Sequence, residues 1–122
     1  MGITLYLINT DYWTYDKYSN NSKNEIKVYR FKSIEESLKV GQFFLDNGIN
    51  EYCGCLVAPY DVDFLDYNQC KLLKQWISKN KKIIIESNLE KIFEVLDDYC
   101  SEAIQLETGI EIESWKKVNI NY

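Results

Sequence analysis

The sequence contains no histidine, and it has only one proline and five glycines among its 122 residues. Without an imidazole the chain has no Ser-His-Asp triad, no Cys-His pair and no His-ligated zinc site. The glycines stand apart from one another and form no phosphate-binding loop. We therefore assign no catalytic residue and expect no cofactor.

Long apolar runs and targeting segments are missing as well. No stretch approaches the roughly 18 apolar residues that a membrane-spanning helix needs, and the first residues lack the basic and then apolar build of a secretion signal. We therefore expect a cytoplasmic protein that does not bind membranes. A length of 122 residues, with 46% hydrophobic and 27% charged residues, predicts one globular domain over residues 1–122.

Acidic residues outnumber basic ones, and the two kinds are separated along the chain. Nineteen Asp and Glu oppose fourteen Lys and Arg, which gives a net charge of −5. Residues 86–113 hold nine acids and one lysine, whereas residues 67–85 hold five lysines and no acid. This balance argues against direct binding of nucleic acid, whose phosphates need a basic surface. We expect surface patches of opposite sign and an acidic field that attracts a basic protein.

The four cysteines fit no metal site. Only one residue separates Cys53 from Cys55, whereas a zinc knuckle needs the Cys-x-x-Cys spacing, and no second pair follows. Cys70 and Cys100 fall on the apolar faces of predicted helices. We expect four free, buried thiols and no bound metal, with a redox role for Cys53 and Cys55 as the alternative.

Hydrophobic periodicity predicts an alternation of strands and helices. Three consecutive isoleucines at residues 83–85 are typical of a strand covered on both faces, and we place that strand at the centre of the sheet. Ser33 and Glu36 have the spacing of a capping box at the start of the first helix. The predicted strands cover residues 3–9, 25–31, 52–58 and 82–86, and the predicted helices cover residues 34–47, 63–80 and 89–100.

The C-terminal part allows two interpretations. A three-residue loop over residues 107–109 would place the apolar side chains on either side of it on one face of a β-hairpin. In the alternative, residues 103–107 are helical and the third helix continues toward Gly109. With the hairpin, the predicted fold is α/β, with α+β as the alternative, and consists of a mixed β-sheet covered by about three helices.

Aromatic and carboxylate side chains are concentrated in two predicted loops, at residues 10–24 and 59–63, and the second patch continues with Asp66 and Tyr67 at the start of the next predicted helix. Tyr and Trp provide a large contact area at a low cost in entropy, and carboxylates attract and pair with basic groups. We therefore predict that these loops bind a protein partner. The candidate partner-binding residues are Asp11, Tyr12, Trp13, Tyr15, Asp16, Tyr18, Tyr60, Asp61, Asp63, Asp66 and Tyr67.

A second interpretation concerns carboxylates that follow predicted strands. Parallel α/β sheets bind ligands at these strand ends, and carboxylate oxygens suit Mg²⁺. The alternative function is therefore a small, metal-dependent, phosphoesterase-like enzyme. No basic phosphate clamp accompanies the carboxylates, and we expect no metal site. The residues concerned are Asp11, Asp61, Asp63 and Glu86.

A small, acidic, histidine-free α/β chain with Tyr and Asp crowded into loops, as at residues 11–18 and 60–66, resembles the immunity proteins of bacterial toxin systems. In general character it is most similar to those of contact-dependent growth inhibition. This resemblance implies a non-enzymatic inhibitor that binds one cognate toxin and blocks its active site or substrate face. It also implies a basic partner, with a nuclease as the expected kind.

Overall fold

The computed structural model describes residues 4–8 and 25–114. These residues form four strands and five helices around one hydrophobic core, so the predicted combination of helices and a sheet in one domain is confirmed. The strands are β1 (Thr4–Ile8), β2 (Glu25–Arg30), β3 (Val62–Leu65) and β4 (Gly109–Glu113). The helices are α1 (Ile34–Asp46), α2 (Ile49–Cys53), α3 (Tyr67–Lys79), α4 (Lys81–Glu86) and α5 (Glu90–Leu106).

The four described strands form one sheet in the order β2-β1-β4-β3. Every neighbouring pair is antiparallel, and Ile112 on β4 lies opposite Leu5 on β1 and Asp63 on β3. The fold is therefore α+β, and the prediction of a mixed sheet is wrong for the described strands. The predicted strands at residues 3–9 and 25–31 are confirmed as β1 and β2, whereas the chain between α1 and α5 supplies only β3 to the sheet.

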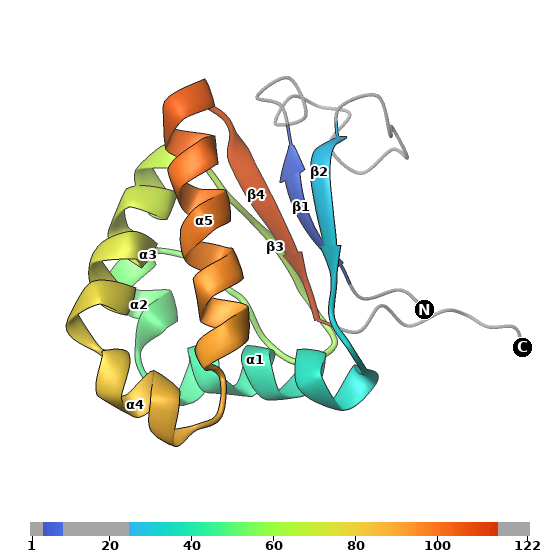
Figure 1. The fold of residues 1–122 in the computed structure, drawn as a ribbon, viewed down its shortest axis with the longest axis vertical. Coiled ribbons are helices and arrows are strands. Elements are labelled where there is room, and N and C mark those ends of the chain that lie inside the picture. The colour runs from blue at the N-terminus through green and yellow to red at the C-terminus, as the bar shows by residue number, and fades with distance from the viewer. Residues whose placement is uncertain (1–3, 9–24, 115–122) are drawn as a thin grey trace, which may run out of the picture.

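One face of the sheet forms the base of the core. Ile110 and Ile112 on β4 and Leu65 on β3 are completely buried. Figure 1 shows α3 and α5 side by side over the sheet. Among the helices of the described part, none has the length and apolar character needed to cross a membrane.

The N-terminal caps of α1 and α3 explain where these helices begin. The Ser33 hydroxyl accepts a hydrogen bond from the Glu36 N–H at 3.1 Å, so the N-cap of α1 is confirmed. The Glu36 carboxylate accepts from the Lys32 N–H at 2.7 Å instead of the Ser33 N–H, so the predicted capping box is incomplete. Asp66 and Gln69 form a complete capping box, in which each side chain accepts a hydrogen bond from the other residue's N–H at 2.9 Å. α3 therefore starts later than predicted, because the residues before this cap belong to β3.

The isoleucine run belongs to α4, so the predicted central strand at residues 82–86 is wrong. Only one of the three isoleucines, Ile84, is buried, and Ile85 is 51% exposed. α4 lies in the connection between α3 and α5, which pack directly against each other and leave no strand position between them. Local hydrogen bonds satisfy the backbone instead, as between the Ile84 N–H and the Asn80 carbonyl at 3.3 Å.

The predicted strand at residues 52–58 is also wrong. This segment begins in α2 and continues as an irregular loop, and the left-handed backbone of Gly48 and Gly54 marks the two ends of the helix. The Asn50 side chain accepts a hydrogen bond from the Val57 N–H at 3.0 Å and donates one to the Val57 carbonyl at 2.8 Å. One amide side chain thus replaces the strand that would otherwise satisfy this backbone.

The prediction of a C-terminal β-hairpin is wrong, because α5 continues through residues 103–106. The helix ends at Glu107, whose left-handed backbone (φ 54°) directs its N–H back to the carbonyls of the last turn. β4 then pairs with β1 and β3 instead of a hairpin partner. The alternative with a longer third helix is correct, and Ile110 and Ile112 still share the core face.

Candidate functional site

The structure describes five of the eleven predicted partner-binding residues. These five follow one another before, within and after β3: Tyr60, Asp61, Asp63, Asp66 and Tyr67. The other six lie outside the described residues: Asp11, Tyr12, Trp13, Tyr15, Asp16 and Tyr18.

Tyr60 and Asp61 present exposed side chains on an anchored loop. Tyr60 is 62% exposed and has a φ of 66°, a left-handed conformation that costs a non-glycine residue about 1 kcal/mol. The Asp61 N–H donates to the Ala58 carbonyl at 3.2 Å, and the Asp61 carbonyl accepts from the Ser114 N–H at 2.9 Å. A strained, exposed aromatic residue on such a loop is a reasonable contact residue, so both stay candidates for partner binding.

Asp63, Asp66 and Tyr67 make local contacts. The Asp63 carboxylate accepts a hydrogen bond from the Leu56 N–H at 2.7 Å, and Asp66 caps α3. Tyr67 is half-buried, and the Lys71 ammonium lies 5.4 Å from the centroid of its ring. These contacts stabilise the fold and account for the three side chains without a partner protein.

The three described carboxylates of the alternative metal site do not meet at the end of a parallel sheet, and Asp11 lies outside the described residues. Asp61 precedes β3 and Asp63 lies within it, whereas Glu86 is the last residue of α4. Within residues 4–8 and 25–114, no group of three or more Cys, Asp or Glu side chains has an arrangement that would hold a metal ion. The topological argument that placed these carboxylates together therefore does not apply to this fold.

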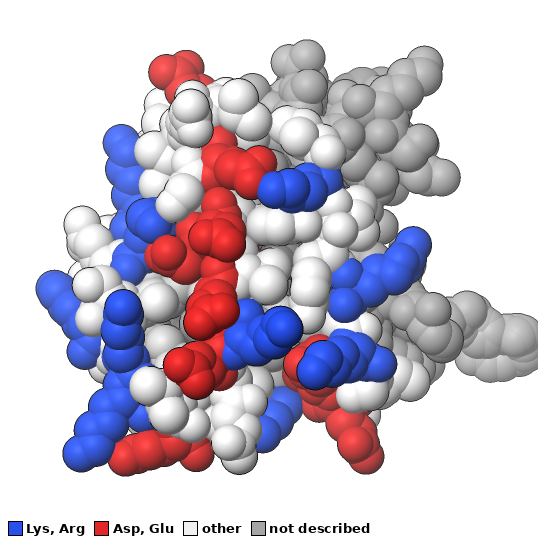
Figure 2. All heavy atoms as spheres, viewed as in Figure 1, with Lys and Arg blue, Asp and Glu red and all other residues white. Residues whose placement is uncertain are grey.

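Carboxylates line the outer side of α5, and we call this surface the α5 ridge. Residues three or four positions apart lie on one side of a helix, and Figure 2 shows acidic side chains in line along this helix. The buried residues of α5, such as Ile92 and Leu96, face the core instead. The members of the α5 ridge are Glu90, Glu94, Asp97, Asp98 and Glu102.

Lysines border the α5 ridge on the side of α3 and α4 (Figure 2). The Lys74 ammonium on α3 lies 3.0 Å from an Asp97 carboxylate oxygen and 2.8 Å from the Ser101 hydroxyl. On another side of the ridge, Lys27 of β2 forms an ion pair with Glu102. Two of the five ridge carboxylates are thus neutralised within the molecule.

Three ridge carboxylates have no ion-pair partner within the described residues. Glu90, Glu94 and Asp98 are exposed, and no described lysine or arginine lies within salt-bridge distance of them. Like charges at positions i and i+4 destabilise a helix by about 0.2–0.5 kcal/mol per pair. Both the Glu90–Glu94 and the Glu94–Asp98 pairs have this spacing. A cation from outside the chain would therefore stabilise the α5 ridge.

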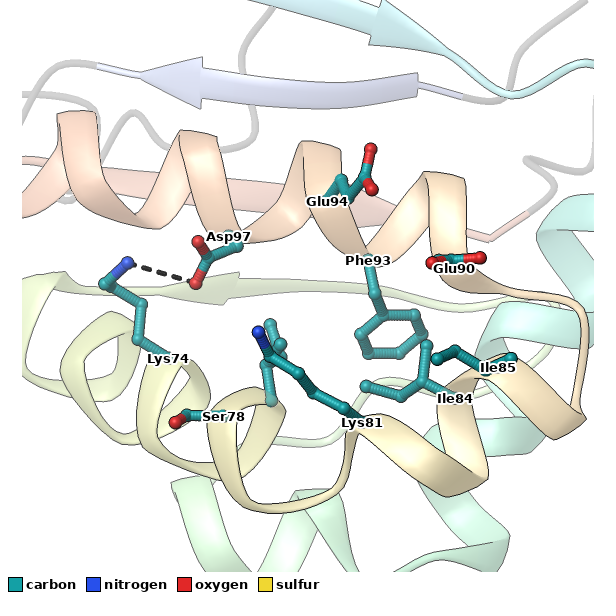
Figure 3. A pocket seen from close by; sticks show the side chains of 10 residues that line it. Lys74, Ser78, Lys81, Ile84, Ile85, Glu90, Phe93, Glu94 and Asp97 are labelled. Atoms are coloured by element: carbon teal, nitrogen blue, oxygen red, sulfur yellow. Dashed lines mark hydrogen bonds and ion pairs between the residues drawn. The ribbon is translucent and has the colours of Figure 1, made fainter.

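A pocket of about 430 Å³ lies between α3, α4 and α5, next to the α5 ridge. Its floor is apolar, with Phe93 and Ile84 only 1% and 3% exposed. Charged side chains surround this floor. Figure 3 shows Lys81 extending from the start of α4 toward α5, with Glu90 and Glu94 on the α5 side. The volume falls within the range of ligand-binding pockets.

The four cysteines are free thiols in the core, and each is at most 4% exposed. The hydrogen bond between Cys53 and Cys55 lowers the pKa of Cys53 and, together with burial, raises the pKa of Cys55. In the second pair, the hydrogen bond with Cys70 and burial raise the pKa of Cys100. The predicted free and buried thiols are confirmed.

We expect a thiol-exchange reagent to find four reactive groups in the denatured protein and to react slowly with the native protein. Burial limits access of the reagent to all four sulfur atoms, although the pKa of one thiol is lowered. Titration with and without denaturant measures both quantities. Two reactive groups after denaturation would contradict this prediction and indicate a disulfide.

The charge separation along the chain predicted patches of opposite sign, and the structure places these patches beside each other on α5 and α3. The spacing of the acids at residues 90, 94 and 98 was the signal for the α5 ridge, once a helix was expected there. The pocket was not predictable, because one of its walls is α4, whose isoleucine run favours a strand.

Comparison with known proteins gives no match, whether with family models, with curated proteins or with solved structures.

Proposed function

We propose that the protein is a non-enzymatic inhibitor of the immunity type, which binds one basic protein toxin and blocks the face that this toxin turns to its substrate. The α5 ridge carries the proposal, since three of its exposed carboxylates have no cationic partner within the described residues. The expected toxin is a nuclease, because a nuclease presents Lys and Arg to nucleic-acid phosphates.

A line of carboxylates competes directly with nucleic acid for such a basic surface. The ridge places a negative charge on successive turns of α5, and each turn advances about 5.4 Å along the helix axis. Lysines and arginines that hold phosphates pair equally well with carboxylates. Long-range attraction also steers the encounter and raises the association rate.

The surroundings of the ridge influence how the partner is oriented and how long it stays bound. The lysines of α3 and α4 repel a basic surface, so the favoured approach is over α5. The apolar floor of the adjacent pocket offers area that can be removed from water in the complex. Charge therefore governs mainly the association rate, and apolar burial governs mainly the dissociation rate.

The direct test is co-expression with the product of the adjacent reading frame. We expect the two proteins to co-purify, the toxicity of that product to be relieved, and the association rate to fall steeply with salt. Glu94→Lys combined with Asp98→Lys should lower the association rate about tenfold or more. Stopped-flow mixing at several salt concentrations measures this rate.

Asp46→Lys combined with Glu51→Lys is the matched control, because it changes the net charge by the same amount at exposed positions of α1 and α2. We expect this control to change the association rate much less than the ridge variant. Equal effects of the two variants would show that only net charge matters and would remove the α5 ridge from the proposal. Failure to bind the adjacent product or to relieve its toxicity would overturn the proposed function.

A further inference from the structure

The pocket beside the α5 ridge combines an apolar floor with a carboxylate wall. Ile77, Ile84 and Phe93 are each at most 7% exposed and form the floor, and the half-exposed Ile85 extends it to the rim. Figure 3 shows Glu90 at one end of this floor and Glu94 one turn further along α5. A ligand that fits must therefore carry an apolar stem and a positive head.

The charges on the opposite wall are not equivalent. Lys74 is already engaged, since its ammonium bonds the Asp97 carboxylate at 3.0 Å and the Ser101 hydroxyl at 2.8 Å. Lys81 has no ion-pair partner within the described residues, and it extends over the pocket from α4 toward α5 (Figure 3). Apart from the Lys74–Asp97 pair, the pocket is lined by one positive charge, that of Lys81, and by two negative charges, those of Glu90 and Glu94.

The position of Lys81 leaves the carboxylates of Glu90 and Glu94 open to a ligand. Its aliphatic stem extends from the start of α4 across the pocket, and its cationic head lies on the side of Asp97, away from Glu90 (Figure 3). It stays more than 4.0 Å from every described carboxylate, so the wall of Glu90 and Glu94 is not neutralised from inside the molecule. A side chain with a cationic head that approaches from outside would lie on the floor of Ile84 and Phe93 and reach this wall.

We propose that the pocket receives an arginine side chain of the basic partner, with its stem on the floor and its guanidinium on Glu90 and Glu94. This inference rests on the proposed function and names its anchoring contact. A guanidinium is planar and pairs with carboxylates through two parallel hydrogen bonds. It also relieves the repulsion between the two glutamates. Lys81 moves aside when the partner's arginine enters.

The test uses the intact protein and a probe of known structure, Nα-acetyl-L-arginine methylamide, in NMR titrations. Its control is the citrulline analogue, which has nearly the same shape but a neutral head. We expect saturable shifts of the amide signals of Ile77, Ser78, Ile84 and Phe93 with the arginine probe. For a ligand of this size we expect a dissociation constant of about 1 mM. The citrulline analogue should bind at least about tenfold more weakly.

Three variants with surface substitutions test the assignment of the individual groups. Glu90→Gln combined with Glu94→Gln should weaken binding of the arginine probe about tenfold or more, because both acceptors lose their charge. Asp98→Asn is the control, since it removes a neighbouring ridge charge that does not line the pocket, and it should weaken binding less than about twofold. Lys81→Met keeps the stem, removes a repelling charge and should strengthen binding about threefold.

Several results would overturn the proposal. These are the absence of saturable shifts at the pocket, equal binding of the citrulline analogue, equal loss in Asp98→Asn and in the double glutamine variant, or weaker binding in Lys81→Met. The last result would assign the pocket to a ligand with an anionic group. If the arginine probe does not bind but the ridge variant still lowers the association rate with the toxin, the arginine pocket is overturned and the proposed function stands. A positive titration without any toxin binding would support the site and overturn the proposed function.

Discussion

Replacing Phe93 by alanine is expected to lower the free energy of unfolding by about 3–5 kcal/mol. Phe93 projects from α5 and is 1% exposed. Its ring centroid lies 5.3 Å from that of Phe43, 6.1 Å from that of Phe44 and 6.5 Å from that of Trp76. The side chain therefore joins three helices, α1, α3 and α5, and its removal leaves a cavity that none of them can close alone.

Equilibrium denaturation in urea measures this loss, and two further variants make it interpretable. Phe93→Leu retains much of the volume and should lower the free energy of unfolding by about 1–1.5 kcal/mol, so it gives a value even if the alanine variant does not fold. Ile85→Ala also changes the pocket, but at a half-exposed position, and should change the free energy of unfolding by about 1 kcal/mol or less. Equal losses for Phe93→Ala and Ile85→Ala would contradict the central position of this ring.

The environment of Phe93 was predictable because α5 has a strong helical period. The predicted core face of the third helix was correct at every position, since all six of its residues are buried. The same period identified α1 and α3, and strand-forming residues identified β1 and β2. The six predicted core residues are Leu89, Ile92, Phe93, Leu96, Tyr99 and Cys100.

The two wrongly predicted strands, at residues 52–58 and 82–86, are short apolar segments whose surroundings decide their structure. A run of three isoleucines fits a buried strand or a helical turn equally well, and only the close packing of α3 against α5 excludes the strand at residues 82–86. At residues 52–58 a single side chain, Asn50, supplies the hydrogen bonds that a neighbouring strand would have supplied. Neither constraint is visible in the local sequence.

One part of the candidate site was predictable from the sequence, and another part was not. Charge separation is a property of the sequence, so the acidic surface was predictable, and the helical spacing of Glu90, Glu94 and Asp98 defines its line. The pocket depends on how α3, α4 and α5 meet, which is a tertiary feature. Two of the predicted partner-binding carboxylates, Asp63 and Asp66, instead have local hydrogen bonds that the composition of the loop did not reveal.

Gly41 on α1 is buried at a point where α1 meets the loop before β3. A Cβ atom at this position would lie 2.6 Å from the Pro59 nitrogen, 2.7 Å from the Ala58 carbonyl carbon and 2.9 Å from the Ser114 hydroxyl oxygen. Two of these three atoms belong to the backbone, so no side-chain rotation relieves the contact. Ser114 in addition donates a buried hydrogen bond to the Ser37 carbonyl of α1 at 2.9 Å.

We therefore expect Gly41→Ala to lower the free energy of unfolding by about 2 kcal/mol or more, because α1 must move away from this loop. The sign is informative, since alanine normally stabilises a helix interior by about 1 kcal/mol relative to glycine. Gly48→Ala is the matched control: it has open space around the new methyl group but a φ of 74°, so it should cost only about 1 kcal/mol. Urea denaturation of both variants decides the question, and a Gly41→Ala protein as stable as the parent would show that the loop before β3 yields to α1.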